Sequence, residues 1–210
     1  MFHAFTATIL RSWNDVLWRK LLHSDKFPVK KFLFFSFLGQ FILLFPVMFF
    51  LGFGLHKFTL LNLIVLFLVI VLGLLANFFN FKGLQHTKIE NAEPLGLSQY
   101  IFATLIAFLV FPGERNILSL VLALLGVMVL LSLNVKRHHL KLDRYSLIII
   151  AGSFFYALMQ NVMKYLLLFF SPFVLLFYRA FLSMIFVSIS LLISFLIINI
   201  SFFSAFFILL

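Results

Sequence analysis

The amino-acid sequence predicts an all-α protein, a polytopic bundle of seven or eight helices that cross a membrane. Of its 210 residues, 64% are hydrophobic and 10% are charged, and the mean hydropathy is +1.20. Soluble domains are about half apolar and a quarter charged, and a folded chain of this size cannot hide such an excess from water. A soluble globular enzyme and a disordered chain are therefore excluded. At about 25–30 residues per span and turn, the length accommodates seven or eight spans.

Long apolar runs predict the spans in order. Because lipid offers the backbone no hydrogen-bond partners and no barrel-type alternation is present, each run should be a helix. A Pro-Gly turn at residues 112–115 separates the third and fourth spans. Ser171-Pro172 separates the fifth and sixth, since proline ends one helix and favours the first position of the next. The predicted spans are residues 32–55, 60–81, 95–112, 116–134, 146–169 and 172–198, and a further run begins at residue 199.

The first 24 residues allow two interpretations. Arg11, Asp15 and Arg19 are spaced i, i+4, i+8, so they share one helical face on which they can pair. Hydropathy favours an amphipathic helix lying at the membrane surface. The alternative is a spanning helix whose polar face lines a cavity, because charged groups in membranes face protein interiors.

Basic residues are concentrated in two loops, and the formal net charge is +10. They lie in short clusters between apolar runs, so we expect them to set topology and contact anionic lipid rather than nucleic acid. The positive-inside rule places both loops in the cytoplasm and the N-terminus outside. The sequence contains no cysteine, which excludes disulfides and thiolate metal sites.

A weak internal repeat divides the chain. At a shift of 146 residues, Asn14 aligns with Gln160 and Asp15 with Asn161, and a long apolar span follows each stretch. Transporters are often built from two repeated halves with the binding site between them. We therefore expect a five-helix repeat at residues 1–145 and a partial second repeat at residues 146–210. An odd number of helices per repeat would place the second half upside down in the membrane. The repeat also favours the interpretation in which the first 24 residues span the membrane.

Three stretches together resemble the EamA family of the drug/metabolite transporter superfamily. The first is HAFTATILRSWNDVLWRKLLHSDKF at residues 3–27. The second covers residues 76–130 and carries two residues of the family pattern. These are Glu114, after the helix that is the fourth in the family, and Gly126, in the family's fifth helix. The third, residues 153–181, includes Ser171-Pro172 and Arg179. The three stretches occur in the order and at the spacing of the family, and the resemblance covers nearly the whole chain.

The resemblance implies a ten-helix, 5+5 inverted-repeat transporter that moves small metabolites, often amino acids or their derivatives. It also implies a multi-pass protein of the cell (inner or plasma) membrane with a cytoplasmic N-terminus. The positive-inside rule places the N-terminus outside, so the orientation stays open. The chain ends where an eighth helix is expected to begin, so we expect an incomplete permease that does not transport alone. The alternative is a non-transporting membrane interaction subunit or an inactive fragment. Expected partners are membrane lipid and a small-molecule substrate, with a homodimer left open.

Polar residues within the predicted spans are candidates for a substrate cavity. Asp15 could exchange a proton or simply pair with a neighbouring arginine. Lys164, one turn from Gln160, could bind a substrate anion or extend to the membrane surface. The other candidates could equally form hydrogen bonds between helices. The candidate cavity residues are Asn14, Asp15, Asn77, Asn80, Gln99, Tyr100, Gln160, Asn161 and Lys164.

A second set of residues has an expected structural role. Glu114 and Arg115 should close the turn between two helices, Gly126 and Pro172 belong to the family pattern, and Arg179 should anchor its helix. His138 and Asp143 form an HxxxxD pattern, which acyltransferases also carry, but no soluble domain surrounds it. No Walker loop, HExxH or GxSxG is present. We therefore expect no catalytic residues, no metal site, no cofactor and no enzyme activity.

Overall fold

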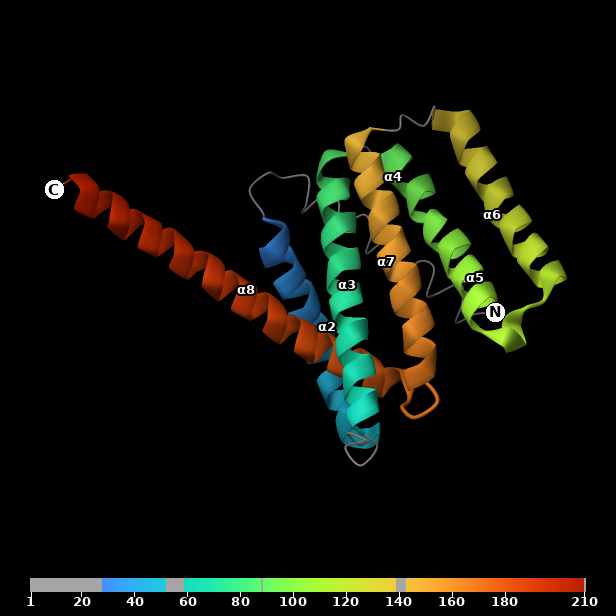
Figure 1. The fold of residues 1–210 in the computed structure, drawn as a ribbon, viewed down its shortest axis with the longest axis horizontal. Helices are drawn as coiled ribbons and strands as arrows, with labels where there is room; N and C mark the ends of the chain where they lie inside the picture. The colour runs from blue at the N-terminus through green and yellow to red at the C-terminus, as the bar shows by residue number, and fades with distance from the viewer. Residues whose placement is uncertain (1–27, 52–58, 88, 139–142, 210) are drawn as a thin grey trace.

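The computed structural model describes residues 28–51, 59–87, 89–138 and 143–209. This part of the chain forms seven α-helices and one short 3-10 helix, without a strand, so the all-α prediction is confirmed (Figure 1). Four helices are long and apolar enough to cross a membrane: α2, α3, α7 and residues Pro172–Phe195 of α8. The elements are α2 (Val29–Leu51), α3 (Leu60–His86), α4 (Ile89–Gly96), α5 (Ser98–Val110), η2 (Pro112–Glu114), α6 (Ile117–His138), α7 (Arg144–Leu166) and α8 (Pro172–Leu209).

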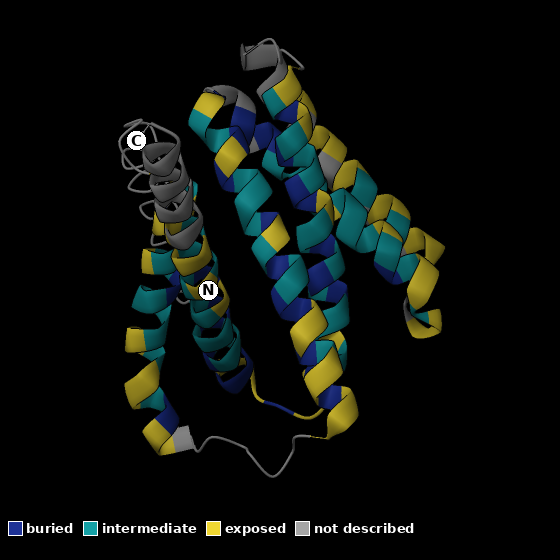
Figure 2. Cartoon of the chain, turned by 60° about the vertical axis from the view of Figure 1, so that its left-hand side comes forward, coloured by how far each residue is buried: buried dark blue, intermediate teal, exposed yellow. Residues whose placement is uncertain are grey.

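The outer faces of these helices are strongly apolar. Phe50 is 91% exposed, Leu60 77% and Leu43 76%. Figure 2 shows exposed residues along the outward sides of the helices and buried ones where helices meet. Soluble monomers rarely expose contiguous apolar patches of this extent, whereas lipid acyl chains solvate such a surface well. The burial pattern therefore agrees with a helical membrane bundle.

Polar side chains cap the starts of two spanning helices. The Thr59 hydroxyl accepts a hydrogen bond from the Asn62 backbone N–H at 3.2 Å and begins α3. The Asp143 carboxylate accepts from the backbone N–H and the hydroxyl of Ser146, at 2.7 and 2.8 Å, and begins α7. These two bonds hold the pKa of Asp143 below its ordinary value. Asp143 of the HxxxxD pattern is thus a helix cap.

The span predicted for residues 95–112 corresponds to a short apolar helical segment, Pro94–Val110, which a turn at Leu97 divides between α4 and α5. Helix α4 contains Pro94 and ends at Gly96, and α5 begins at Ser98. Proline removes one backbone donor from the helix ladder, and glycine is among the poorest helix formers. Tight three-residue turns form at this junction, from the Leu97 N–H to the Pro94 carbonyl and from the Tyr100 N–H to the Leu97 carbonyl.

The predicted helix end at residue 198 is wrong. Helix α8 continues without a break for 38 residues, from Pro172 to Leu209. No proline or glycine follows Pro172 in this helix, and Asn199 alone does not break it. At 1.5 Å per residue the helix is about 57 Å long, well above the roughly 30 Å of a hydrocarbon core. Figure 1 shows it crossing α3 obliquely, but a tilt within the usual range of about 0–40° still leaves the helix longer than the hydrocarbon core.

Helices α3 and α7 form the closest pair, and small residues let their backbones approach. They are antiparallel, because Phe79 stacks on Phe155 at 5.6 Å while His86, at the end of α3, meets Tyr145 at the start of α7. Three glycines lie at this interface: Gly73 against Met159, Gly83 against Ile149 and Gly152 against Asn80. Small residues of this kind are typical of membrane helix interfaces, where close backbone approach gives dispersion energy.

Helices α2 and α8 form a second antiparallel pair. Lys30 in the first turn of α2 donates to Ser194 late in α8 at 2.8 Å, and Phe41 meets Phe177 and Phe181 earlier in α8, each at 5.4 Å. The first turn of α2 also contacts the last turns of α3 through Phe32 and Phe81, whose ring centroids are 5.0 Å apart. The start of α2 and the end of α3 therefore lie at the same membrane surface.

Candidate functional site

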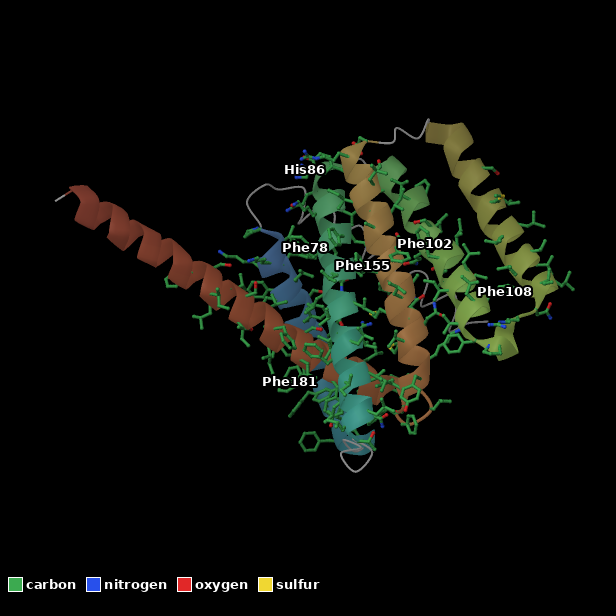
Figure 3. The ribbon with its side chains drawn as sticks, in the orientation of Figure 1. Phe78, His86, Phe102, Phe108, Phe155 and Phe181 are labelled. Atoms are coloured by element: carbon green, nitrogen blue, oxygen red, sulfur yellow. The ribbon has the colours of Figure 1, made fainter. Side chains whose placement is uncertain are left out.

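A cavity of about 570 Å³ lies between α5, α6 and α7, next to the η2 turn. Helix α5 contributes small residues that leave room beside its backbone, and α7 contributes three polar side chains from its last two turns. Figure 3 shows Phe108 near the lower end of α5, on the side toward α6. The lining residues are Ala103, Thr104, Ala107, Phe108, Gly113, Asn116, Leu120, Gln160, Asn161 and Lys164.

Asn161 is the most buried polar side chain of this cavity, with 5% of its surface exposed. Its amide nitrogen donates to the Ala157 carbonyl within α7, at 2.9 Å, and to the Ala103 carbonyl of α5, at 3.2 Å. The second bond ties α5 to α7 at the cavity wall. Its Oδ1 atom is buried without a hydrogen-bond partner among the described residues. A buried acceptor of this kind costs free energy until a donor meets it.

Lys164 lies in the last turn of α7, with its ammonium 5.1 Å from the centre of the Phe111 ring. It is 20 residues from Arg144 at the start of the helix, or about 30 Å along the helix axis, which matches the hydrocarbon thickness. Lys164 thus lies near the membrane surface opposite Arg144. The cavity extends inward from that surface to Asn161 and Gln160, which lie about one turn deeper along α7.

The turn between α5 and α6 closes one side of the cavity. The Arg115 guanidinium donates to the Leu109 carbonyl at 3.1 Å and so satisfies one of the last carbonyls of α5. The Asn116 side-chain oxygen accepts from the Leu118 N–H at 3.0 Å at the start of α6. Glu114 is the last residue of η2, and its side chain lies outside the described part of the structure.

The sequence candidates on α3 and at the start of α5 lie away from this cavity. Asn77 donates to the Gly73 carbonyl of its own helix at 2.9 Å. Asn80 packs against Gly152 where α3 and α7 meet. Gln99 and Tyr100 lie in the first turn of α5 and do not line the cavity. Asn14 and Asp15 lie outside the described residues.

The residues with expected structural roles lie at distinct places. Pro172 is the first residue of α8, and the Ser171 hydroxyl before it accepts from the Val174 N–H at 3.4 Å. Arg179 extends from α8 toward α7, where its guanidinium donates to the Met159 sulfur at 3.8 Å. Gly126 on α6 faces open space, because no described atom lies within 4 Å of the point that a Cβ atom would occupy there.

Two polar residues of the cavity, Thr104 and Asn116, are absent from the sequence candidates. Thr104 lies five residues after Gln99, and its hydroxyl donates to the Tyr100 carbonyl at 2.8 Å. The signal that could have identified it is the small-residue face of α5, where Ala103, Thr104 and Ala107 leave space beside the helix. Asn116 directly follows the Pro-Gly turn, and a polar residue there also serves as a helix cap.

The cavity combines an ammonium group, three amides and a hydroxyl with apolar side chains. Lysine and amide N–H groups donate to carboxylate oxygens, and amide and hydroxyl oxygens accept from ammonium groups. A volume within about 300–1,000 Å³ is usual for small-molecule sites, which are mostly apolar with a few converging polar groups. The arrangement can therefore bind a small polar metabolite.

Comparison with known proteins supplies the family. The model of the EamA-like transporter family matches residues 1–132, more than half of the chain. Neither the curated proteins nor the solved structures contain a significant match. Members of this family are transporters rather than enzymes, and the apolar helices indicate a multi-pass membrane protein in contact with lipid. The chain belongs to the EamA-like transporter family, within the drug/metabolite transporter superfamily.

Proposed function

We propose that this chain binds small carboxylate-bearing metabolites, such as amino acids, in the cavity between α5, α6 and α7, as part of a secondary transporter. The single observation behind this proposal is a cavity of about 570 Å³, lined by Gln160, Asn161 and Lys164, inside an otherwise apolar bundle. Polar and ionisable groups are costly in a membrane, so their convergence on one cavity favours a functional site.

The position of the charges suggests how a substrate would bind. Lys164 at the membrane end of the cavity would bind the carboxylate, with Gln160 one turn away as a further donor. The buried Oδ1 atom of Asn161, beside Gln160, would accept from a substrate N–H group. A zwitterionic amino acid carries both groups, which is why we favour this substrate class.

The helix pairing supports an inverted repeat of residues 1–145 and 146–210. A shift of 146 residues relates Val29–Leu51 to the first part of α8, and α2 and α8 pack antiparallel. Repeats related by an axis in the membrane plane bring equivalent helices together in opposite directions. Alternating access would then proceed by rocking of the two repeats, with Asn14 and Asp15 as the counterparts of Gln160 and Asn161. The inner or plasma membrane of the cell is the site we propose for this activity.

Ligand binding by the purified 210-residue chain tests the proposal without requiring transport. A panel of amino acids and short carboxylic acids is screened by thermal unfolding in detergent. A binder present at 100 times its Kd should stabilise the chain by about 2.7 kcal/mol, or roughly 5–10 °C in Tm. Lys164→Gln should weaken binding of that compound about 10- to 100-fold, because it removes a charged hydrogen-bond donor.

Arg144→Gln is the matched control. It removes one positive charge from the start of the same helix, at the opposite membrane surface, and should retain binding. The proposal fails if no member of the panel raises the Tm. It also fails if Lys164→Gln and the unmodified chain bind equally well.

A further inference from the structure

A second cavity, of about 190 Å³, lies between α2, α3 and α8, at the other end of the bundle from the cavity described above. Six of its eight lining residues are apolar, and two of them, Leu75 and Phe186, belong to the exposed surface that faces lipid. Figure 3 shows Phe78 on the side of α3 toward α2 and α8. The lining residues are Lys30, Leu33, Leu74, Leu75, Phe78, Phe186, Val187 and Ser190.

Two lysines lie at the polar end of this cavity. Lys30 lines it directly, and its ammonium is oriented over α8 by the bond to the Ser194 hydroxyl at 2.8 Å. Lys82 extends over the lining ring of Phe78, with its ammonium 5.8 Å from the ring centre. An ammonium group carries three N–H donors, so the Ser194 bond leaves Lys30 with donors for an anion.

Both lysines lie at the depth of lipid head groups. Lys30 is in the first turn of α2, and Lys82 is 22 residues after Leu60, about 33 Å along α3. This distance spans the hydrocarbon core, so Lys82 reaches the membrane surface on the side where α2 begins. The Phe32–Phe81 contact brings these two helix ends together.

We propose that this second cavity binds one anionic phospholipid. The phosphate lies against Lys30 and Lys82, and the first part of an acyl chain lies among Leu33, Leu75 and Phe186. Basic cavities between membrane helices at the head-group level recognise anionic lipids through this combination of charge and apolar contact. A free phosphate ion would gain nothing from six apolar lining residues, whereas a lipid uses both ends of the cavity.

Native mass spectrometry of the detergent-purified full chain tests this site. The chain is titrated with phosphatidylglycerol and phosphatidylcholine of identical acyl composition. Phosphatidylglycerol should form the stronger single adduct. Lys30→Gln/Lys82→Gln should weaken this adduct about 30-fold, the effect of two charges near an anionic head group. Leu75→Trp, which keeps both lysines but fills the apolar part, should weaken the adducts of both lipids.

The matched control is Lys31→Gln/Arg144→Gln, which removes two positive charges from the same membrane surface, outside the cavity. It should bind phosphatidylglycerol like the unmodified chain. Equal binding of the two lipids would overturn the proposal, as would an equal loss in the control, which would indicate a diffuse surface charge. Displacement of the lipid by millimolar inorganic phosphate would also contradict a lipid site. Unchanged thermal unfolding of each variant shows that lost binding is not lost folding.

Discussion

Replacement of Gly152 by leucine should separate α3 from α7 and destabilise the whole bundle. A Cβ atom at this position would lie 2.9 Å from the backbone nitrogen of Asn80 and 2.8 Å from its Cγ atom. A side chain can rotate away, but the backbone of α3 cannot, because Gly73 and Gly83 hold it close to α7 on either side. Overpacking of this kind costs about 3 kcal/mol or more, equivalent to a Tm lower by about 6–12 °C.

Gly126→Leu is the matched control for this prediction. It makes the same change in a helix of similar length, but no described atom lies within 4 Å of the point that its Cβ atom would occupy. We expect the control to unfold at the wild-type temperature or slightly above, because leucine is a better helix former than glycine. Equal destabilisation by the two substitutions, measured by thermal unfolding in detergent, would show that α3 and α7 are not in close contact.

Asn161→Ala should reduce ligand binding and weaken the contact between α5 and α7 together. The substitution removes the bond to the Ala103 carbonyl and the buried Oδ1 acceptor of the cavity. Loss of the acceptor should lower ligand affinity about tenfold, as expected for one hydrogen bond. Hydrogen bonds between membrane helices contribute about 0.6 kcal/mol on average and up to roughly 1.7 kcal/mol, so the Tm should fall by a few degrees.

Asn77→Ala is the control that isolates the stability contributed by the hydrogen bond between helices. Its amide donates to the carbonyl four residues earlier, at 2.9 Å, in the same way that Asn161 donates to Ala157. Of these two asparagines, Asn161 is the one that also donates to a neighbouring helix in the described structure. Thermal unfolding should therefore show a smaller loss for Asn77→Ala. A larger loss would mean that the Asn161–Ala103 bond does not hold the helices together.

The positions of most helices were predictable because the hydropathy of the sequence is a strong and local signal. Runs of apolar residues fix the spans, and the Ser171-Pro172 stop and start locates the beginning of α8 within the described chain. The turn between α4 and α5 also has a local signal, because Pro94 and Gly96 follow the polar stretch at residues 90–93 and directly precede the apolar α5. The expected end of α8 at residue 198 relied on a mild polarity at Asn199, which a helix tolerates.

The cavity was only partly predictable. Gln160, Asn161 and Lys164 stand out because polar groups at i, i+1 and i+4 are rare in an apolar span, and the structure places all three at one cavity. Thr104 and Asn116 join them only through the packing of α5 and α6, which depends on contacts between distant segments. Asn77 and Asn80 carry the same polarity signal, yet the packing of α3 against α7 directs them elsewhere.

Water access at α5 tests most directly whether a substrate cavity exists inside a membrane bundle. The chain contains no cysteine, so single-cysteine variants need no background substitutions. Thr104 lines the cavity, whereas the adjacent Leu105 belongs to the exposed apolar surface that faces lipid. In proteoliposomes, a charged, membrane-impermeant thiol reagent should modify Thr104→Cys at least about tenfold faster than Leu105→Cys, because thiolates form and react only in water. Equal rates, or faster modification of Leu105→Cys, would contradict a water-filled cavity between α5, α6 and α7.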